Sequence, residues 1–183
     1  MQKLFNITNE TDHIVKIELA NGKKHNPLSL ELIKELTNSL IQISSQKKVK
    51  VLIISSEGPG FSAGHDLDEL RKNKNNKKFF NELFNECSNL MQTIMNLPQP
   101  VIAEVCGIAA AAGCQLVASC DLAVASEQAS FMTPGVNIGL FCSTPMVAVS
   151  RNLSRKKIME MLLTGEKLSA KDAVDYGLSL IHI

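Results

Sequence analysis

The sequence predicts a single α/β domain with a largely parallel sheet, and three observations carry this prediction. Short apolar runs such as Val51–Ile54 and Val101–Val105 have the length and composition of buried strands. Longer segments between or before them, such as Ser29–Ile43 and Phe79–Leu97, repeat apolar residues every three or four positions, as amphipathic helices do. Strands that alternate with helices in this way are typical of parallel crossovers, and no shift in composition marks a second folded domain.

The first part of the chain begins with a strand signal. His13–Leu19 alternates apolar with polar residues and leads into a turn at Asn21 and Gly22. Ser29–Ile43 then predicts a helix. Its apolar face comprises Leu32, Ile33, Leu36, Leu40 and Ile43. Val51–Ile54 follows and predicts a strand that is buried on both faces.

The middle of the chain alternates helices and strands. Asp66 is placed to cap a short helix that begins near Leu67, and Phe79–Leu97 predicts a long helix that Pro98 stops. A basic stretch between the two helices predicts a solvated loop; it holds Arg71, Lys72, Lys74, Lys77 and Lys78. The elements expected further along are a strand at 101–105, a helix at 113–119, a strand at 122–125 and a helix at 169–176. We therefore expect an N-terminal extension at 1–12, one domain at 13–177, and an anomalous or truncated C-terminus at 178–183.

Composition excludes several classes of function. The formal net charge is +1, so neither a nucleic-acid nor a membrane partner is expected. No segment has the ~20 unbroken apolar residues of a membrane span. The five cysteines are odd in number and sit inside apolar segments, which argues against a disulfide framework and favours small core side chains in a reducing compartment. No Cys or His residues share the spacing of a zinc site, so no metal is expected.

Two segments could carry chemistry, and each also has a plain structural interpretation. Gly60–Leu70 leaves a strand through Gly64 and enters a helix, so the N–H groups near His65 lack helical partners and could hold a developing oxyanion. The alternative is an ordinary strand–loop–helix corner. Gly107–Leu116 places a run of small residues after a buried strand, where a helix start could also present N–H groups. Here the alternative is tight packing of a helix on the sheet.

Together these segments resemble the two signatures of the crotonase superfamily, the enoyl-CoA hydratase/isomerase family. The family patterns are F-x-A-G-x-D and G-x-A-x-G-G-G-x-E/Q, and this chain reads Phe-Ser-Ala-Gly-His-Asp from Phe61 and Gly-Ile-Ala-Ala-Ala-Ala-Gly-Cys-Gln from Gly107. The resemblance runs from about Ile14 to Gly177. It implies the crotonase (ClpP-like) fold, an α/β spiral of ββα units, and we expect the family's C-terminal helical part to be missing from this chain.

The resemblance also implies site residues. The backbone N–H groups of His65 and Ala112 would form an oxyanion hole for the carbonyl of an acyl-CoA thioester. Backbone carbonyls of Ala63, His65 and Leu67 would bind the adenine of coenzyme A, and Lys24 would lie near its phosphates. The basic stretch at 71–78 has a second interpretation here, as a surface that attracts those phosphates. No separate cofactor is expected, because coenzyme A is part of the substrate or ligand.

Two departures from the family pattern limit the expected chemistry. Gln115 and Gly135 stand where hydratases of the family have their two glutamates. An amide does not titrate and glycine has no side chain, so neither can act as a general acid or base. Hydration is therefore expected to be inefficient. The alternatives are a non-catalytic acyl-CoA binder with a regulatory role, or a decarboxylase or thioesterase of the same fold.

Other side chains could replace the missing glutamates, but a structural role is favoured for each. Glu104 suggests an ion pair or a cap, Asp121 a residue at a strand entry, and Asp66 the helix cap; the ring of His65 is expected to be a spectator. Cys142 lacks an evident base. The remaining candidates border the expected acyl pocket or could hydrogen-bond a substrate; they are Thr133, Asn137, Ser143 and Thr144.

The resemblance carries expectations about assembly and location as well. Members usually form homo-oligomers, so a trimer or hexamer is expected of the full-length protein. The family relationship favours a mitochondrial location. The visible N-terminus does not look like a presequence, since Glu10 and Asp12 follow a single lysine. A cytoplasmic location is therefore the alternative, unless a presequence lies outside this chain.

Overall fold

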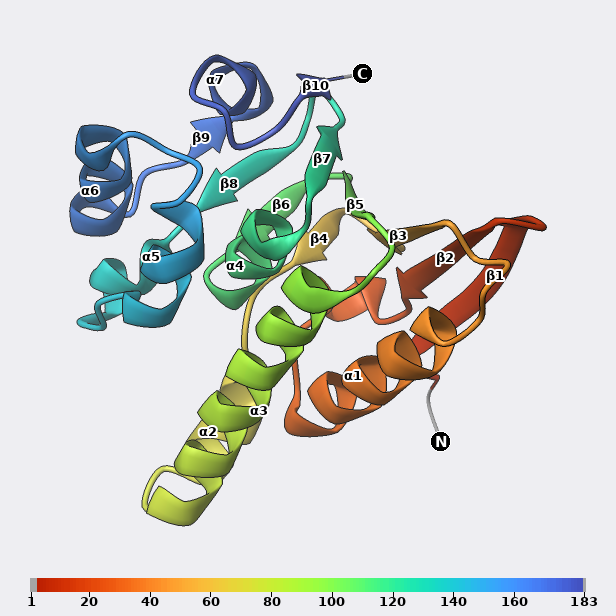
Figure 1. Ribbon diagram of the computed structural model, residues 1–183. Coiled ribbons are helices and arrows are strands. Elements are labelled where there is room, and N and C mark those ends of the chain that lie inside the picture. Colours follow the sequence, from red (N-terminus) through yellow and green to blue (C-terminus); the bar gives the residue numbers. More distant parts are fainter. Residues whose placement is uncertain (1–2, 183) are drawn as a thin grey trace.

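A six-stranded sheet forms the centre of the molecule in the computed structural model, which describes residues 3–182 (Figure 1). Its order is β1-β2-β3-β5-β7-β10. The strands are β1 (Phe5–Thr11), β2 (Ile14–Leu19), β3 (Val51–Ser56), β5 (Val101–Val105), β7 (Leu122–Ala125) and β10 (Ile181–His182). Only the β1–β2 pair is antiparallel, and the other pairs described in this sheet are parallel. The predicted α/β class and the strands expected at 13–19, 51–54, 101–105 and 122–125 are confirmed.

Both ends of the described chain belong to this sheet. Within the segment expected to be an extension, Phe5–Thr11 pairs with β2 in a hairpin, so the sheet continues on the amino side of the boundary drawn at residue 12. Within the segment expected to be anomalous, the Leu180 N–H donates to the Ala123 carbonyl and Ile181–His182 pairs with β7. Residues 1, 2 and 183 lie outside the described part.

Helices α1 (Leu30–Ser44) and α3 (Lys77–Asn96) pack side by side on one face of the sheet (Figure 1). Ser29 caps α1, accepting from the Leu32 N–H at 3.2 Å, and the helix predicted from Ser29 to Ile43 is confirmed. The prediction that Val51–Ile54 is buried on both faces is wrong. Leu52 and Ile54 are buried, but Ile53 is only half-buried, because the helices cover one face of the sheet and leave the other partly open.

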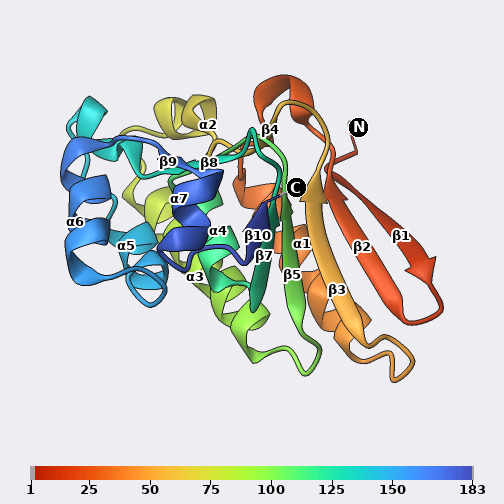
Figure 2. The ribbon, with the colours of Figure 1, turned by 90° about the horizontal axis from the view of Figure 1, so that it is seen from above.

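A second, four-stranded sheet has the order β4-β6-β8-β9. Its strands are β4 (Gly60–Ser62), β6 (Ile108–Ala110), β8 (Ser130–Met132) and β9 (Leu168–Ser169). Along the chain β3 is followed by β4, β5 by β6 and β7 by β8, and helical structure follows each pair. This repeated ββα order is the spiral that the family resemblance implies. Seen from above, the strands of the larger sheet follow one another from β1 to β7 and β10, and α5, α6 and α7 lie beyond β7 (Figure 2).

The remaining helices lie around the second sheet. They are η1 (Gly22–Lys24), α2 (Leu67–Lys72), α4 (Ala112–Ser119), η2 (Pro134–Ile138), α5 (Ser143–Val149), α6 (Arg155–Thr164) and α7 (Ala170–Asp175). Because α2 ends at Lys72 and α3 begins at Lys77, both ends of the basic stretch are helical, and the loop expected there is confined to 73–76.

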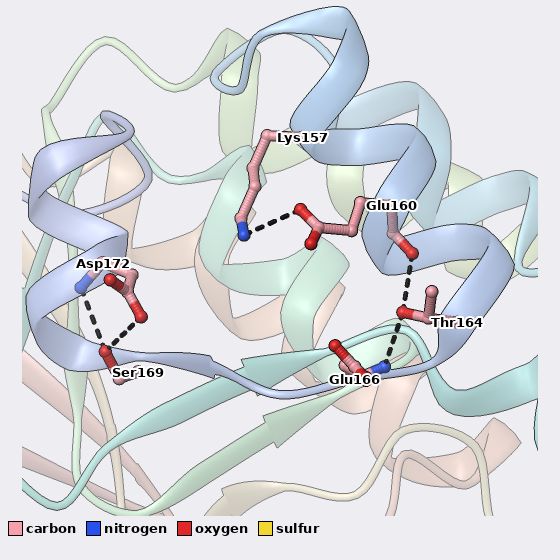
Figure 3. Close-up of polar contacts among 6 residues, drawn as sticks. All are labelled: Lys157, Glu160, Thr164, Glu166, Ser169 and Asp172. Carbon is pink, nitrogen blue, oxygen red and sulfur yellow. Dashed lines mark hydrogen bonds and ion pairs between the residues drawn. The ribbon is translucent and has the colours of Figure 1, made fainter.

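Short polar contacts fix the connection from α6 to α7 (Figure 3). The Thr164 hydroxyl donates to the Glu160 carbonyl at 2.8 Å and accepts from the Glu166 N–H at 3.2 Å, which closes the end of α6. Ser169 caps α7 by accepting from the Asp172 N–H at 3.1 Å. Between the two helices, β9 pairs antiparallel with β8 and completes the second sheet.

Candidate functional site

The two signature segments leave the second sheet at the same edge. Strands β4 and β6 are parallel neighbours, with Gly60 opposite Ile108 and Ser62 opposite Ala109. The carboxyl ends of parallel strands lie at one edge, so the segments that follow β4 and β6 emerge side by side. His65 follows β4, and Ala112 follows β6 as the first residue of α4. Topology therefore brings together two loops that are more than forty residues apart.

The backbones of these two loops are in direct contact. Gly64 has a φ of +88°, and a Cβ built on it would lie 3.0 Å from the Ala110 carbonyl oxygen and 3.2 Å from the Ala112 nitrogen. A Cβ on Gly113 would lie 2.4 Å from the Ser62 carbonyl oxygen. Only glycine permits an approach this close. The Ala112 nitrogen thus lies against the residue that precedes His65.

The N–H groups of His65 and Ala112 both lack protein acceptors. The Leu28 N–H donates to the Gly64 carbonyl and the Asp66 N–H donates to the Leu28 carbonyl, so the N–H of His65 between them points to the opposite side. Ala112 opens α4, where the first N–H groups have no intrahelical acceptor. Among the hydrogen bonds of residues 3–182, none uses either N–H. Two adjacent free donors of this kind can stabilise a carbonyl oxygen that gains negative charge.

Ala111 holds the second loop in a strained conformation. Its φ is +49° and its ψ is −119°, a region that residues with a Cβ rarely adopt. Its N–H donates to the Met132 carbonyl at 3.0 Å, and its carbonyl accepts from the Gln115 N–H at 3.0 Å. Both neighbouring elements therefore hold Ala111 in place, directly before the N–H of Ala112. Strain held in this way is common beside functional sites.

The residues expected to contact coenzyme A lie around the first loop. Ala63 and Leu67 are exposed, and the Ala63 N–H donates to the His25 carbonyl at 2.8 Å. The Lys24 ammonium lies 3.9 Å from the Asp68 carboxylate, in the first turn of α2, so η1 and α2 are neighbours. The structure thus brings Lys24 to the same loop as the three predicted carbonyls.

Gln115 and Gly135, at the positions of the family glutamates, have different surroundings. Gln115 lies one helical turn after Ala112, is 7% exposed, and its Oε1 has no hydrogen-bond partner among the described residues. A Cβ on Gly135 would lie 2.4 Å from the Leu140 carbonyl oxygen and 2.7 Å from the Cys142 Sγ. The loop that precedes α5 therefore leaves no room for a Cβ at position 135.

The other carboxylates have the structural roles predicted for them. Glu104 pairs with Lys16 at 2.8 Å on the open face of the six-stranded sheet. The Asp121 carboxylate accepts from the Val101 N–H at 2.8 Å, at the start of β5. Asp66 caps α2, accepting from the N–H groups of Asp68 and Glu69. In residues 3–182, no group of three or more His, Cys, Asp or Glu side chains is arranged to hold a metal ion.

The ring of His65 is held away from solvent. It packs edge-on against Phe84 with ring centroids 5.5 Å apart, and its Nδ1 lies 3.4 Å from the Leu28 carbonyl oxygen. Burial lowers the pKa of His65, so the ring is neutral at pH 7. The contact to a carbonyl assigns the proton to Nδ1, which leaves Nε2 as an acceptor; it has no partner among the described residues.

The cysteines are unactivated thiols, and their placement corrects one prediction. Burial raises the pKa of Cys87 to about 11 and that of Cys114 to about 12, and it also raises the pKa of Cys142, which precedes α5. None of these groups forms a thiolate near pH 7. The expectation that all five cysteines pack as core residues is wrong for Cys106, which is exposed in the bend between β5 and β6, and Cys120 is only half-buried.

A cavity of about 260 Å³ adjoins Gln115, and sequence reasoning missed most of its lining. It lies between α3, α4 and α5, and its walls include Phe84, Met91 and Thr144. The pattern of α3 places Met91 on the core face, but which helix closes the other side of a groove depends on tertiary packing. Of the other candidates, Thr133 is fully buried with an unpartnered hydroxyl, whereas Asn137 and Ser143 are exposed.

Comparison with known proteins decides the family. The profile of the Enoyl-CoA hydratase/isomerase family matches residues 9–180. The chain belongs to this family. It is 53% identical over 169 residues to human "Enoyl-CoA hydratase domain-containing protein 3, mitochondrial". The match covers 92% of this chain and 55% of that protein. It is 32% identical over 171 residues to a "Probable enoyl-CoA hydratase" of Bacillus subtilis. That match covers 91% of this chain and 65% of the bacterial protein.

Solved structures of this family confirm the fold. The crystal structure of human enoyl-CoA hydratase domain-containing protein 3 matches with a TM-score of 0.94 at 49% identity, over 99% of this chain and 71% of that one. An enoyl-CoA hydratase of Mycobacterium smegmatis matches with a TM-score of 0.95 at 42% identity, over 99% and 70%. The chain spans a little over half the length of the curated human relative. Within residues 3–182, no helix combines the length and apolar character needed to cross a membrane.

Proposed function

We propose that this chain binds fatty acyl-CoA or enoyl-CoA thioesters, with the thioester carbonyl oxygen between the N–H groups of His65 and Ala112. The observation that carries the proposal is the backbone contact of the two signature loops at Gly64, beside two N–H groups without acceptors. Two preorganised donors favour the enolate-like oxygen over the neutral carbonyl, and each is typically worth a factor of ~10²–10³ in rate. Membership of the enoyl-CoA hydratase/isomerase family supports a thioester as the ligand.

The rest of coenzyme A would follow the first loop. Carbonyls of Ala63, His65 and Leu67 would accept from the adenine amino group, and Lys24 would approach the phosphates from η1. The exposure of Ala63 and Leu67 and the neighbouring ammonium of Lys24 support this placement. Lys24 contributes a modest electrostatic attraction, because it is exposed and screened by salt.

Water addition would be inefficient in this site. Gln115 cannot exchange a proton, and the surroundings of Gly135 leave no volume for a second carboxylate. His65 is neutral, but its Nδ1 already contacts a carbonyl and its ring packs on Phe84. A general acid–base pair typically contributes ~10²–10⁴ in rate, so most hydratase activity would be absent.

A non-catalytic acyl-CoA binder with a regulatory role is the second candidate function, and the same two positions favour it. Decarboxylation and thioester hydrolysis stay open, because both need the oxyanion hole and neither needs the two glutamates in their hydratase roles. The names of the human, rat and mouse relatives include "mitochondrial", which supports a mitochondrial location for this protein over a cytoplasmic one. Assembly into a trimer or hexamer is proposed from family membership alone.

The test combines binding and turnover on the chain as it stands. Isothermal titration with crotonyl-CoA and longer enoyl- and acyl-CoA thioesters should show binding, and assays of the same panel should show weak or no hydration. Binding without product from any thioester would reject the enzyme interpretation and retain the binder. No heat with any thioester would reject the proposal as a whole.

Ala112→Pro removes one proposed donor, and it also crowds Ala111, whose ψ of −119° brings its Cβ toward the proline ring, so the fold of the variant is checked by circular dichroism. Ala112 is the first residue of α4, so the lost N–H had no helical acceptor. We expect any thioester turnover to fall ~10²–10³-fold while CoA binding persists. The control is Arg155→Pro, at the exposed first position of α6, which should keep full turnover. Unchanged turnover in Ala112→Pro would remove this N–H from the site.

A further inference from the structure

We infer that the cavity between α3, α4 and α5 receives the acyl chain and that Arg151 selects a free carboxylate at the far end of that chain. The ligand class is therefore the coenzyme A monothioester of a dicarboxylic acid. This inference rests on the proposed function, since it assigns the substrate class of the same site.

The cavity begins beside the proposed oxyanion hole. Gln115 lies three residues after Ala112 on α4, and Ser119 lies four residues further, so all three share one face of the helix. Gln115 and Ser119 both line the cavity. From Ala112 to Ser119 the helix rises ~10 Å, so the cavity extends from the carbonyl end of a bound thioester along α4.

Helix α3, which forms the opposite wall of the cavity, shows the same order from the thioester end to the far end. Phe84, on α3, lines the cavity and also packs against the ring of His65, so this end is the thioester end. Met95 lines the cavity eleven residues later on α3, a rise of ~16 Å. The Arg151 Nη1 lies 3.5 Å from the Met95 Sδ, so Arg151 stands at the far end of the cavity.

The Arg151 guanidinium is exposed and open to a ligand's carboxylate. Its guanidinium donates to the Met95 thioether, which is a weak acceptor. Among the ion pairs of residues 3–182, none includes Arg151. A guanidinium offers several N–H donors in a fork that matches a carboxylate, and such charge-assisted pairs are stronger than neutral hydrogen bonds. The end of a hydrocarbon chain would gain nothing from this group.

The polar lining supports a functionalised acyl chain over a plain one. Gln115 is 7% exposed and lines the cavity, and its Oε1 accepts no hydrogen bond from residues 3–182. A buried acceptor without a donor costs free energy unless a ligand or water satisfies it. Ligand pockets are lined mainly by apolar groups, with a few polar groups that fix the ligand's orientation, and Gln115 and Arg151 are among the polar groups here. The two ends of the cavity thus carry polar groups, with Met91 and Val147 among the apolar residues between them.

The experiment compares pairs of thioesters that have equal carbon number and differ only at the far end. Isothermal titration of the chain with adipyl-CoA against hexanoyl-CoA, and suberyl-CoA against octanoyl-CoA, should show the dicarboxylic member of at least one pair binding about three- to tenfold tighter. The preference should decrease as the salt concentration rises. Equal affinity within both pairs would overturn the inference and leave the proposed function intact. Absence of binding by all four thioesters would overturn both.

Variants assign the preference to one side chain. Arg151→Gln should remove the preference by weakening adipyl-CoA binding more than hexanoyl-CoA binding, whereas Arg151→Lys should retain part of it. Arg155→Gln, which changes an exposed arginine outside the cavity, should keep the full preference. A preference that survives in Arg151→Gln, or an equal loss of affinity for both members of a pair, would contradict the role of Arg151.

Discussion

Replacing Gly64 by alanine tests the contact on which the site depends. The new Cβ would lie 3.0 Å from the Ala110 carbonyl oxygen and 3.2 Å from the Ala112 nitrogen, at a φ of +88°. The left-handed conformation costs an L-residue ~1–2 kcal/mol, less the ~0.4–1 kcal/mol gained from a stiffer unfolded chain. Crowding of a packed site adds ~1–3 kcal/mol. We expect the free energy of unfolding to fall by about 2–4 kcal/mol.

Gly139→Ala is the matched control, because it separates the two costs. Gly139 also has a positive φ, +76°, but a Cβ there would meet nothing within 4 Å. Urea unfolding of this variant should show a loss of only ~1 kcal/mol, from backbone strain alone. Titration with a CoA thioester should show weaker binding in Gly64→Ala and unchanged binding in Gly139→Ala. Equal stability losses in the two variants would mean that the loops are not in contact at Gly64.

Two further predictions concern the same loops. Ala111→Gly should raise the free energy of unfolding by ~1 kcal/mol, because glycine removes the strain at φ +49°. The control Ala109→Gly, in β6, should lower the free energy of unfolding by a similar amount. A lower free energy of unfolding in Ala111→Gly would contradict the strain. Burial lowers the pKa of His65, so the unfolded chain binds a proton at this residue that the folded chain does not. Stability should therefore be lost as the pH falls below the ordinary histidine pKa of ~6.5, by up to ~1.4 kcal/mol per pH unit. His65→Gln should lack this part of the pH dependence in urea titrations between pH 7 and 5, and an identical profile would show that the ring is not kept neutral.

The sequence predicts α1, α3 and the four central strands of the larger sheet, because their signals are local, whereas β1, β10, α5 and α6 are not predicted. Apolar spacing identifies α1 and α3, and Asp66 caps α2 at the position expected of it. The second sheet has no such signal. Gly60–Ser62 and Ile108–Ala110 are three residues long and rich in small side chains, so no periodicity marks them as strands. They pair only because β3 and β5 already lie side by side.

The candidate site also has parts that the sequence predicts and parts that only the fold shows. His65 and Ala112 could be identified from motifs, whereas their approach depends on the pairing of β4 with β6 and on the glycines at 64 and 113. Arg151 gave no sequence signal, because its importance comes from Met95, which is more than fifty residues away in the chain. Features that depend on two distant segments require the fold before they can be interpreted.

The two substituted glutamate positions are not equivalent, and this limits what the site can do. Gln115→Glu exchanges groups of nearly equal size and so causes no steric conflict, although an ionised carboxylate at this buried position has a desolvation cost. Gly135→Glu requires a Cβ 2.4 Å from the Leu140 carbonyl oxygen, so the loop that leads to Cys142 would have to move, and unfolding experiments should show a loss of ~1–3 kcal/mol. We therefore expect even the double variant to hydrate crotonyl-CoA poorly, because the second carboxylate is excluded by backbone packing and not only by residue type. A double variant with wild-type stability and rapid hydration would show that this loop adapts, and the chemistry would then differ from that of the hydratases by side chains alone.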